Sequence, residues 1–287
     1  MTADYRKWIL SLAAATAGLG VVDFAQAGSI QQPGMTTGLP EGFAPTEGLY
    51  GVTMLNFGGY NANGSWSNST VGIPAFLTWS TPWEPLGARL EFKAAPFVFM
   101  DMNGQSMRAG SLYNPYVGAW LSWFVGNGFN FAIGEGVQIG VDTTVDNATG
   151  RNFNAFQQNV ALSYVRNNLD LTANAFYTTG NTSVWASQPE TFNVDLTATK
   201  KDGRLEYGLV GYGEWDLNRP NLRYGPEQSE FAVGGLVGYL LGNQISGQLK
   251  LTHAVYERNM GGNDTRLWGQ LIIPLWTPPA PAPRNAK

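Results

Sequence analysis

The sequence predicts an all-β fold, a transmembrane antiparallel up-and-down β-barrel of about 12 strands. Three observations carry this prediction: long segments in which polar and apolar residues alternate, connections that alternate between short and long, and a composition poor in charge. Charged residues make up 13% of the 287-residue chain, against roughly 25% in a typical soluble domain. Aromatic residues also make up 13% and include ten Trp. A surface that faces lipid needs few charges and carries aromatic residues at its two borders.

The N-terminal residues 1–27 have the three parts of a secretory signal peptide. A basic pair at 6–7 is followed by an uncharged, mostly apolar run at 8–22, and the small residues of Ala-Gln-Ala at 25–27 end the segment. This order predicts export and cleavage after Ala27. The apolar run is too short to cross a bilayer core of roughly 30 Å comfortably, so a membrane helix is the weaker interpretation.

The rest of the chain divides into three parts by composition. Residues 28–47 contain four Gly and three Pro without any period, which predicts an irregular periplasmic lead-in. Residues 48–276 carry the barrel. Residues 277–287 contain four Pro and predict a flexible tail. The chain has no Cys, which excludes disulfides, thiolate chemistry and a lipid anchor at the cleavage site.

Strand character recurs along the whole barrel region, in segments long enough for the roughly 9–11 residues of a tilted membrane strand. Short turns at 126–128, 167–168, 201–203 and 242–243 alternate with longer connections, as short periplasmic turns and long outer loops do. An even strand number leaves both termini in the periplasm and predicts a multi-pass protein of the bacterial outer membrane. The predicted strands are 48–59, 70–80, 86–101, 113–124, 128–142, 155–166, 169–180, 190–200, 203–217, 229–241, 244–257 and 265–276.

Period-two alternation predicts which side chains face the lumen. The charged residues with the parity of the polar face, which predict the lining of a pore, are Arg89, Glu91, Lys93, Asp170, Asp195, Arg204, Glu206, Glu214 and Lys250. The aromatic residues with the same parity, which predict contacts with a solute, are Phe97, Phe99, Trp120 and Tyr212. Charges of both signs can tune the selectivity of a pore. They can equally hydrogen-bond to one another and fill a narrow lumen.

The sequence offers no constellation for catalysis. Its one histidine, His253, lies on the apolar face of a predicted strand. Outer-membrane phospholipases with twelve strands place a Ser two residues from such a His, whereas here that position is Val255. We therefore expect no enzyme, no catalytic residue, no metal and no cofactor. The mature chain has a formal charge of −4 and no basic run, so nucleic acid is not an expected partner.

Both ends of the barrel region resemble a known family. The segment Leu-Pro-Glu-Gly at 39–42, Pro45 and Gly-Leu-Tyr at 48–50 are similar to the start of outer-membrane proteins named after the MetA pathway of phenol degradation. The closing Ile-Pro-Leu-Trp at 273–276 is similar to the last strand of that family, although proteins of this kind usually end at the aromatic residue. The resemblance implies a transporter-like barrel, often linked to the uptake of hydrophobic or aromatic compounds, and implies no site residue.

These observations lead to one expected function and one alternative. We expect an outer-membrane channel for passive uptake of small molecules, with hydrophobic or aromatic compounds as candidate solutes. The alternative is a structural or adhesive barrel with a plugged lumen. The expected partners are the lipid bilayer and lipopolysaccharide, a small-molecule solute, and the outer-membrane assembly machinery, which recognises a last strand ending on an aromatic residue such as Trp276.

Overall fold

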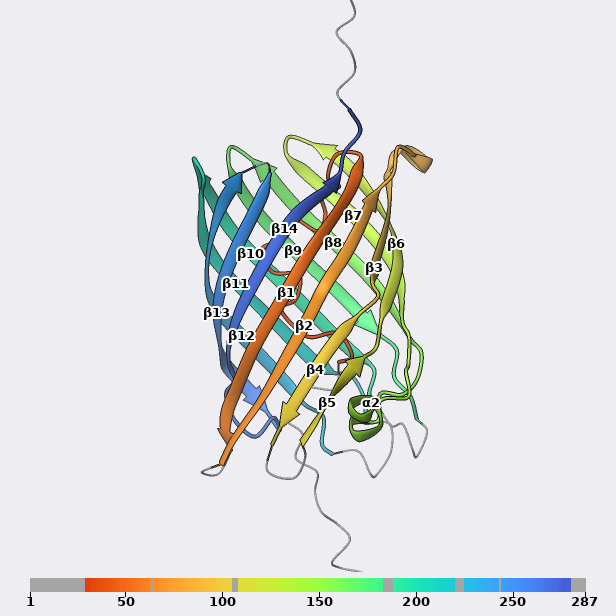
Figure 1. Cartoon of the computed structure of the whole chain (residues 1–287), viewed down its shortest axis with the longest axis vertical. Helices are drawn as coiled ribbons and strands as arrows, with labels where there is room; N and C mark the ends of the chain where they lie inside the picture. The colour runs from red at the N-terminus through yellow and green to blue at the C-terminus, as the bar shows by residue number, and fades with distance from the viewer. Residues whose placement is uncertain are drawn as a thin grey trace, which may run out of the picture.

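The computed structural model describes residues 29–62, 65–104, 108–182, 188–219, 225–242 and 244–279. Antiparallel strands form a closed barrel (Figure 1), in which β14 pairs with both β13 and β1. The predicted signal peptide and most of the predicted tail lie outside the described residues. The strands are β1 (Gly48–Ala62), β2 (Ser65–Ser80), β3 (Arg89–Ala95), β4 (Val98–Asn103), β5 (Arg108–Tyr113), β6 (Tyr116–Gly126), β7 (Phe129–Gln138), β8 (Ala155–Arg166), β9 (Leu169–Thr178), β10 (Thr191–Asp202), β11 (Leu205–Asp216), β12 (Ser229–Gly242), β13 (Ile245–Arg258) and β14 (Thr265–Trp276).

Two of the crossings are interrupted, so these segments make a barrel of 12 strands. β3 and β4 both pair with β2 and form one crossing that breaks at 96–97. β5 pairs with β4 and β6 pairs with β3, so these two form the next crossing, broken at 114–115. The predicted fold class, an antiparallel transmembrane barrel of about 12 strands, is confirmed.

Many apolar residues of the barrel wall face outward, and many of its polar residues face the lumen. Leu209 and Leu249 are exposed on the outer face, whereas Asn193 and Lys250 point to the opposite face and are buried in the lumen. This is the reverse of a soluble protein and suits a lipid environment, which offers no hydrogen-bond partners to the backbone. Because the sheet is closed, a strand that pairs on both sides has hydrogen-bond partners for its backbone N–H and C=O groups. Such a strand presents no unpaired edge to lipid.

Tight turns join the strands at the end of the barrel where β14 ends. Asn167 and Asn168, between β8 and β9, have φ of +54° and +64°. This conformation is that of the two-residue turns that favour Asn and match the right-handed twist of the flanking strands. The short turns that the sequence predicted at 126–128, 167–168 and 201–203 lie at this end.

The opposite end carries the short helix α2 (Thr144–Thr149), which packs against β5. Within the described residues β4 is the only strand that pairs with β5, and α2 lies beside its other edge. The Val145 amide donates to the Ser111 hydroxyl at 3.0 Å, which fixes the helix to that edge. One short 3-10 turn, η1 (Pro85–Gly87), precedes β3. Neither helix, nor any other in the described part of the chain, has the length and apolar character needed to cross a membrane.

The interruption between β3 and β4 corrects two predicted solute contacts. Ala95 and Val98 are both buried although their positions differ by three, an odd number, so the parity of the strand changes at Pro96. Proline has no N–H for the ladder, and an extra residue in a strand turns the following side chains to the other face. Phe97 and Phe99 therefore lie exposed on the outer face, and the prediction that they face the lumen and contact a solute is wrong.

Candidate functional site in the barrel lumen

Residues 29–43, which we call the lumen segment, lie inside the barrel. Figure 1 shows this segment in red, crossing the interior from the end where β1 begins toward the end that carries α2. The sequence predicted that residues 28–47 are irregular, and the segment contains turns but no helix or strand. The alternation pattern gave no indication that the segment occupies the lumen.

Two glycines let the lumen segment fold tightly within the barrel. Gly34 and Gly38 both have φ of +82°, in the left-handed region that other residues rarely adopt. A Cβ atom on Gly34 would lie 2.5 Å from the ring of Tyr212. The buried Tyr212 ring, predicted to contact a solute, therefore packs against the backbone of the segment instead.

Asp195 on β10 holds the first of these turns. Its carboxylate accepts hydrogen bonds from the Gly34 amide at 2.9 Å, from the Thr36 amide at 2.8 Å and from the Thr36 hydroxyl at 2.7 Å. Hydrogen bonds to an ionised acceptor are stronger than those between neutral groups. One side chain of the wall thus fixes three donors of the lumen segment.

Two lysines hold the second half of the segment from different walls. Lys93 on β3 donates to Glu41 at 2.7 Å and also lies 3.8 Å from the ring centroid of Trp120. Lys250 on β13 donates to the carbonyl and the hydroxyl of Thr37, at 2.8 and 3.0 Å. Because both ammonium groups are buried, these contacts replace hydration that each would otherwise lose.

A cavity with a solvent-accessible volume of about 60 Å³ remains between the lumen segment and the barrel wall. Its two sides differ in chemistry. Apolar side chains from β1 to β6 cover one side: Met54, Val71, Ile73, Phe76, Ala95, Val98, Met100, Tyr113 and Tyr116. Polar and charged side chains cover the other side: Gln138, Arg151, Gln157, Asn159, Glu214, Glu230, Asp264 and Arg266.

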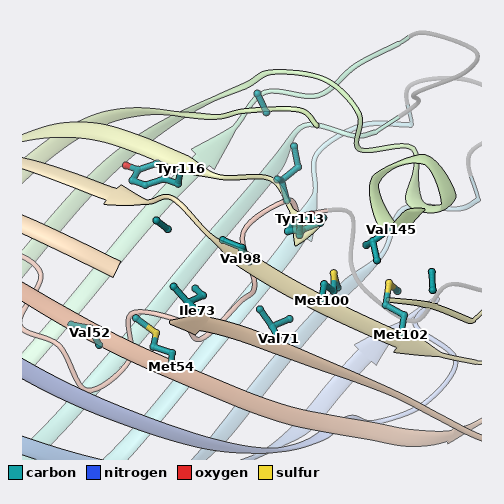
Figure 2. Packing of buried hydrophobic residues seen from close by; sticks show 14 residues of the cluster. Val52, Met54, Val71, Ile73, Val98, Met100, Met102, Tyr113, Tyr116 and Val145 are labelled. Atoms are coloured by element: carbon teal, nitrogen blue, oxygen red, sulfur yellow. The ribbon is translucent and has the colours of Figure 1, made fainter. Parts of the chain in front are cut away.

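The apolar side belongs to a continuous hydrophobic cluster on the inner wall. Figure 2 shows Met54, Ile73, Val71, Val98 and Met100 on neighbouring strands, with side chains gathered in one patch. The lumen segment adds its own apolar side chains to the same cluster, among them Ile30, Met35 and Leu39. The lumen segment thus presents backbone polar groups to one wall and side chains to the other.

The structure places the predicted charged residues in two groups. The prediction that Arg89 and Arg204 line the lumen is wrong. Arg89 binds Glu84 at the rim where β3 begins, and Arg204 is exposed in the turn before β11. Parity stops predicting direction where a strand ends in a turn. The other charged residues are buried inside the barrel, and their lining of an open pore stays a prediction: Glu91, Lys93, Asp170, Asp195, Glu206, Glu214 and Lys250.

Trp120 is the one predicted solute contact that lines the cavity. Its ring lies over Gly134 on β7, where an added Cβ atom would come within 2.5 Å of it. Glu41, Glu230 and Arg266 also lie in the lumen, and the sequence did not predict this. Glu41 belongs to the irregular segment, where no period exists to indicate its direction. Among the described residues, no group of three or more His, Asp or Glu side chains is placed to hold a metal ion.

Three comparisons relate this geometry to known proteins. The model of the family described as "Putative MetA-pathway of phenol degradation" matches residues 53–270. The COG4313 outer membrane channel from Pseudomonas putida F1 has a similar structure, with a TM-score of 0.61 at 12% identity over 84% of this chain and 98% of that one. The NanC porin has a TM-score of 0.49 at 10% identity, over 77% of this chain and 98% of that one. The search of curated proteins found no match. The likeness to the COG4313 channel supports the outer-membrane barrel fold.

Proposed function

The chain belongs to the family named after the MetA pathway of phenol degradation, and we propose that it is an outer-membrane channel for passive uptake of small hydrophobic or aromatic molecules. The observation that carries the proposal is the two-sided cavity in the lumen. Sites for small molecules are mostly apolar and carry a few polar groups that orient the ligand. The cavity, with Met100 and Ile73 on one side and Gln157 on the other, has this character.

The proposal includes the route by which the protein reaches its place. A signal peptide cleaved after Ala27 exports the chain, and the assembly machinery recognises β14, which ends on Trp276. Lipid and lipopolysaccharide surround the apolar outer face, and both termini of the barrel face the periplasm. The tight turns and the start of β1 share one end of the barrel, which supports this orientation.

Single-channel conductance of the refolded protein in a planar bilayer tests the channel, measured with and without benzoate as a small aromatic acid. We expect stable conductance steps that benzoate reduces, because the acid occupies the apolar side of the cavity. Met100→Trp fills this side and should weaken the effect of benzoate. Leu251→Trp adds the same ring on the lipid-facing side and should leave the effect unchanged.

The lumen segment favours a second function, that of a structural or adhesive barrel with a plugged lumen. Its contacts with Asp195, Lys93 and Lys250 close much of the interior. Under this alternative the protein folds, as judged by a heat-dependent shift on gels, but conducts no ions and is indifferent to benzoate. That combination of results would reject the channel.

A further inference from the structure

Two hydrogen-bond donors in the cavity have no acceptor. Tyr116 is 7% exposed and Trp120 is 4% exposed, and both line the cavity. Within the described residues, neither the Tyr116 hydroxyl nor the indole N–H of Trp120 makes a hydrogen bond. A buried polar group without a partner is costly, so two such groups at one cavity indicate a ligand that supplies the missing acceptor.

The two donors come together over Gly118. Tyr116, Gly118 and Trp120 occupy alternate positions of β6, so they share its inner face. An added Cβ atom at Gly118 would collide with the Tyr116 hydroxyl, which therefore reaches over this glycine toward the indole. Even a hydrogen bond from the indole to the phenol oxygen would leave the hydroxyl proton without an acceptor, because an indole N–H only donates.

Neighbouring groups hold both rings in place. The Trp120 ring lies over Gly134, and the ammonium group of Lys93 is 3.8 Å from its centroid. The Tyr116 ring stacks on Phe76, with centroids 6.3 Å apart and an angle of 15° between the planes. Because the two donors are already fixed, an acceptor can bind them without ordering flexible side chains first.

The acidic side chain beside this place is already bound elsewhere. Glu41 accepts a hydrogen bond from Lys93 at 2.7 Å, and it lies near Tyr116 without accepting from the hydroxyl. Lys93 is directly opposite Gly118 in the register of β3 and β6, so its positive charge lies beside the two donors. The surroundings therefore favour a ligand oxygen that accepts hydrogen bonds over a group that only donates them.

Apolar side chains surround the same place. Ala95 is directly opposite Tyr116 in the strand register, and Val98 is opposite Tyr113. These residues and Ile73 belong to the hydrophobic cluster that contains Tyr116 (Figure 2). A ligand that places an oxygen at the two donors can thus lay an apolar ring on this cluster.

We propose that the Tyr116 hydroxyl and the indole N–H of Trp120 form a binding site for the oxygen atom of an aromatic carbonyl or carboxyl compound, whose ring lies on the apolar side of the cavity. This inference rests on the proposed function and names the chemistry of the solute. A hydrocarbon of the same shape leaves both donors unpaired and binds more weakly.

Binding of acetophenone and cumene to the refolded protein in detergent, measured by equilibrium dialysis, tests the proposal. The two molecules have nearly the same shape, and a methyl group of cumene replaces the carbonyl oxygen of acetophenone. Tyr116→Phe removes only the hydroxyl in the cavity, and Tyr207→Phe removes the same group on the outer face. Each ligand enters the detergent equally with every variant, so the ratio of its dissociation constants between variants does not depend on the detergent.

Tyr116→Phe should weaken acetophenone binding about three- to tenfold, because one hydrogen bond to the ligand is lost. The affinity for cumene should change less than about twofold, and Tyr207→Phe should change neither affinity. An equal change for both ligands, or none for either, overturns the proposal. The second of these results is also expected if only water occupies the place beside the two donors.

The stability of the ligand-free protein gives a second measurement. Because the Tyr116 hydroxyl has no partner in the described chain, Tyr116→Phe should leave the urea midpoint unchanged or raise it. A lower midpoint would mean that the hydroxyl bonds within the barrel, which overturns the proposal. A barrel that conducts but does not distinguish the two ligands rejects this site alone, whereas one that distinguishes them but does not conduct rejects the channel alone.

Discussion

The two walls of the lumen use opposite chemistry within one barrel. The wall formed by β1, β2, β4 and β5 presents Val, Ile and Met to the interior, with Ile73 and Met100 at its centre. The wall formed by β8 to β13 presents Asn, Thr, Gln and charged side chains, and Asp195 and Lys250 hold the lumen segment there. The cavity lies along the apolar wall, and the polar wall positions the lumen segment that limits the cavity.

The two walls are also stabilised in different ways. On the polar wall, each group depends on a matching partner, because a buried polar group without one costs about 1–3 kcal/mol. On the apolar wall, contact depends on volume and apolar area, and a ligand can replace a neighbouring side chain without loss of hydrogen bonds. The lumen segment bridges both, with its amides toward Asp195 and with Met35 toward the apolar cluster.

The largest expected effect comes from a new charge on the apolar wall. Ile73→Asp should lower the free energy of unfolding by about 3–5 kcal/mol, because a buried charge there has no partner. Asn159→Asp introduces the same group on the polar wall and keeps the acceptor for Gln157, so its loss should be about 1 kcal/mol. Urea unfolding followed by tryptophan fluorescence measures both. Equal losses would show that the two walls do not differ in this way.

Removal of the Asp195 carboxylate should release the lumen segment while leaving the barrel intact. Asp195→Ala deletes the acceptor of three hydrogen bonds and should weaken the seating of the segment by about 2–3 kcal/mol. Under the proposed function, single-channel conductance rises, and hydrogen exchange quickens at residues 34–38. Asp170→Ala is the control, because Asp170 binds Thr172 on its own strand and none of the segment. A conductance that rises equally in both variants would contradict the assignment.

The sequence predicts the polar wall better than the apolar wall. In β10, Asn193, Asp195 and Thr197 alternate with Phe192 and other apolar residues, and this contrast tells which face is inside. In β4 the contrast is reversed: the buried positions are apolar and the exposed ones include Asp101 and Asn103, so polarity does not mark the inner face. The change of parity at Pro96 then reversed the predicted positions of the Phe residues that follow.

The place of the lumen segment could not be predicted from its residues. Asp195 and Lys250 bind its backbone amides and a carbonyl, which every residue carries, so the contacts leave no pattern in residues 29–43. The sequence did indicate that Asp195 and Lys250 need partners. Each was predicted to face the lumen, and a buried charge is stable only with a partner.

Loss of the buried ion pair between Glu41 and Lys93 should have a moderate effect. Glu41→Gln keeps a hydrogen bond to Lys93, which also retains Glu91 at 3.9 Å, so the loss of stability should be about 1–2 kcal/mol. Glu84→Gln removes the solvent-exposed ion pair of Arg89 at the rim and should change stability by less than about 1 kcal/mol. Urea midpoints compare the two. A larger loss at the rim would contradict the role of burial.

The smallest effect is a pH dependence at α2, where the apolar wall ends. Burial beside Val145 raises the pKa of the Asp146 carboxyl from its ordinary 3.8 to about 6. A raised pKa means that the docked helix binds more protons than the undocked one between these values. The docking is therefore strongest below pH 4 and weakens as the pH rises through 6. The effect is confined to one short helix, so global stability changes little.

Hydrogen exchange of residues 144–149, corrected for intrinsic rates, measures this docking at pH 5 and pH 8. The wild type should be more protected at pH 5. Asp146→Asn should be equally protected at both values, because the amide carries no charge and fits the same space. Greater protection of the wild type at pH 8 would mean that the charged carboxylate is the form that the docked helix prefers. A charged side chain would then stabilise the docking of α2 at the end of the apolar wall, where β4 and β5 present apolar side chains.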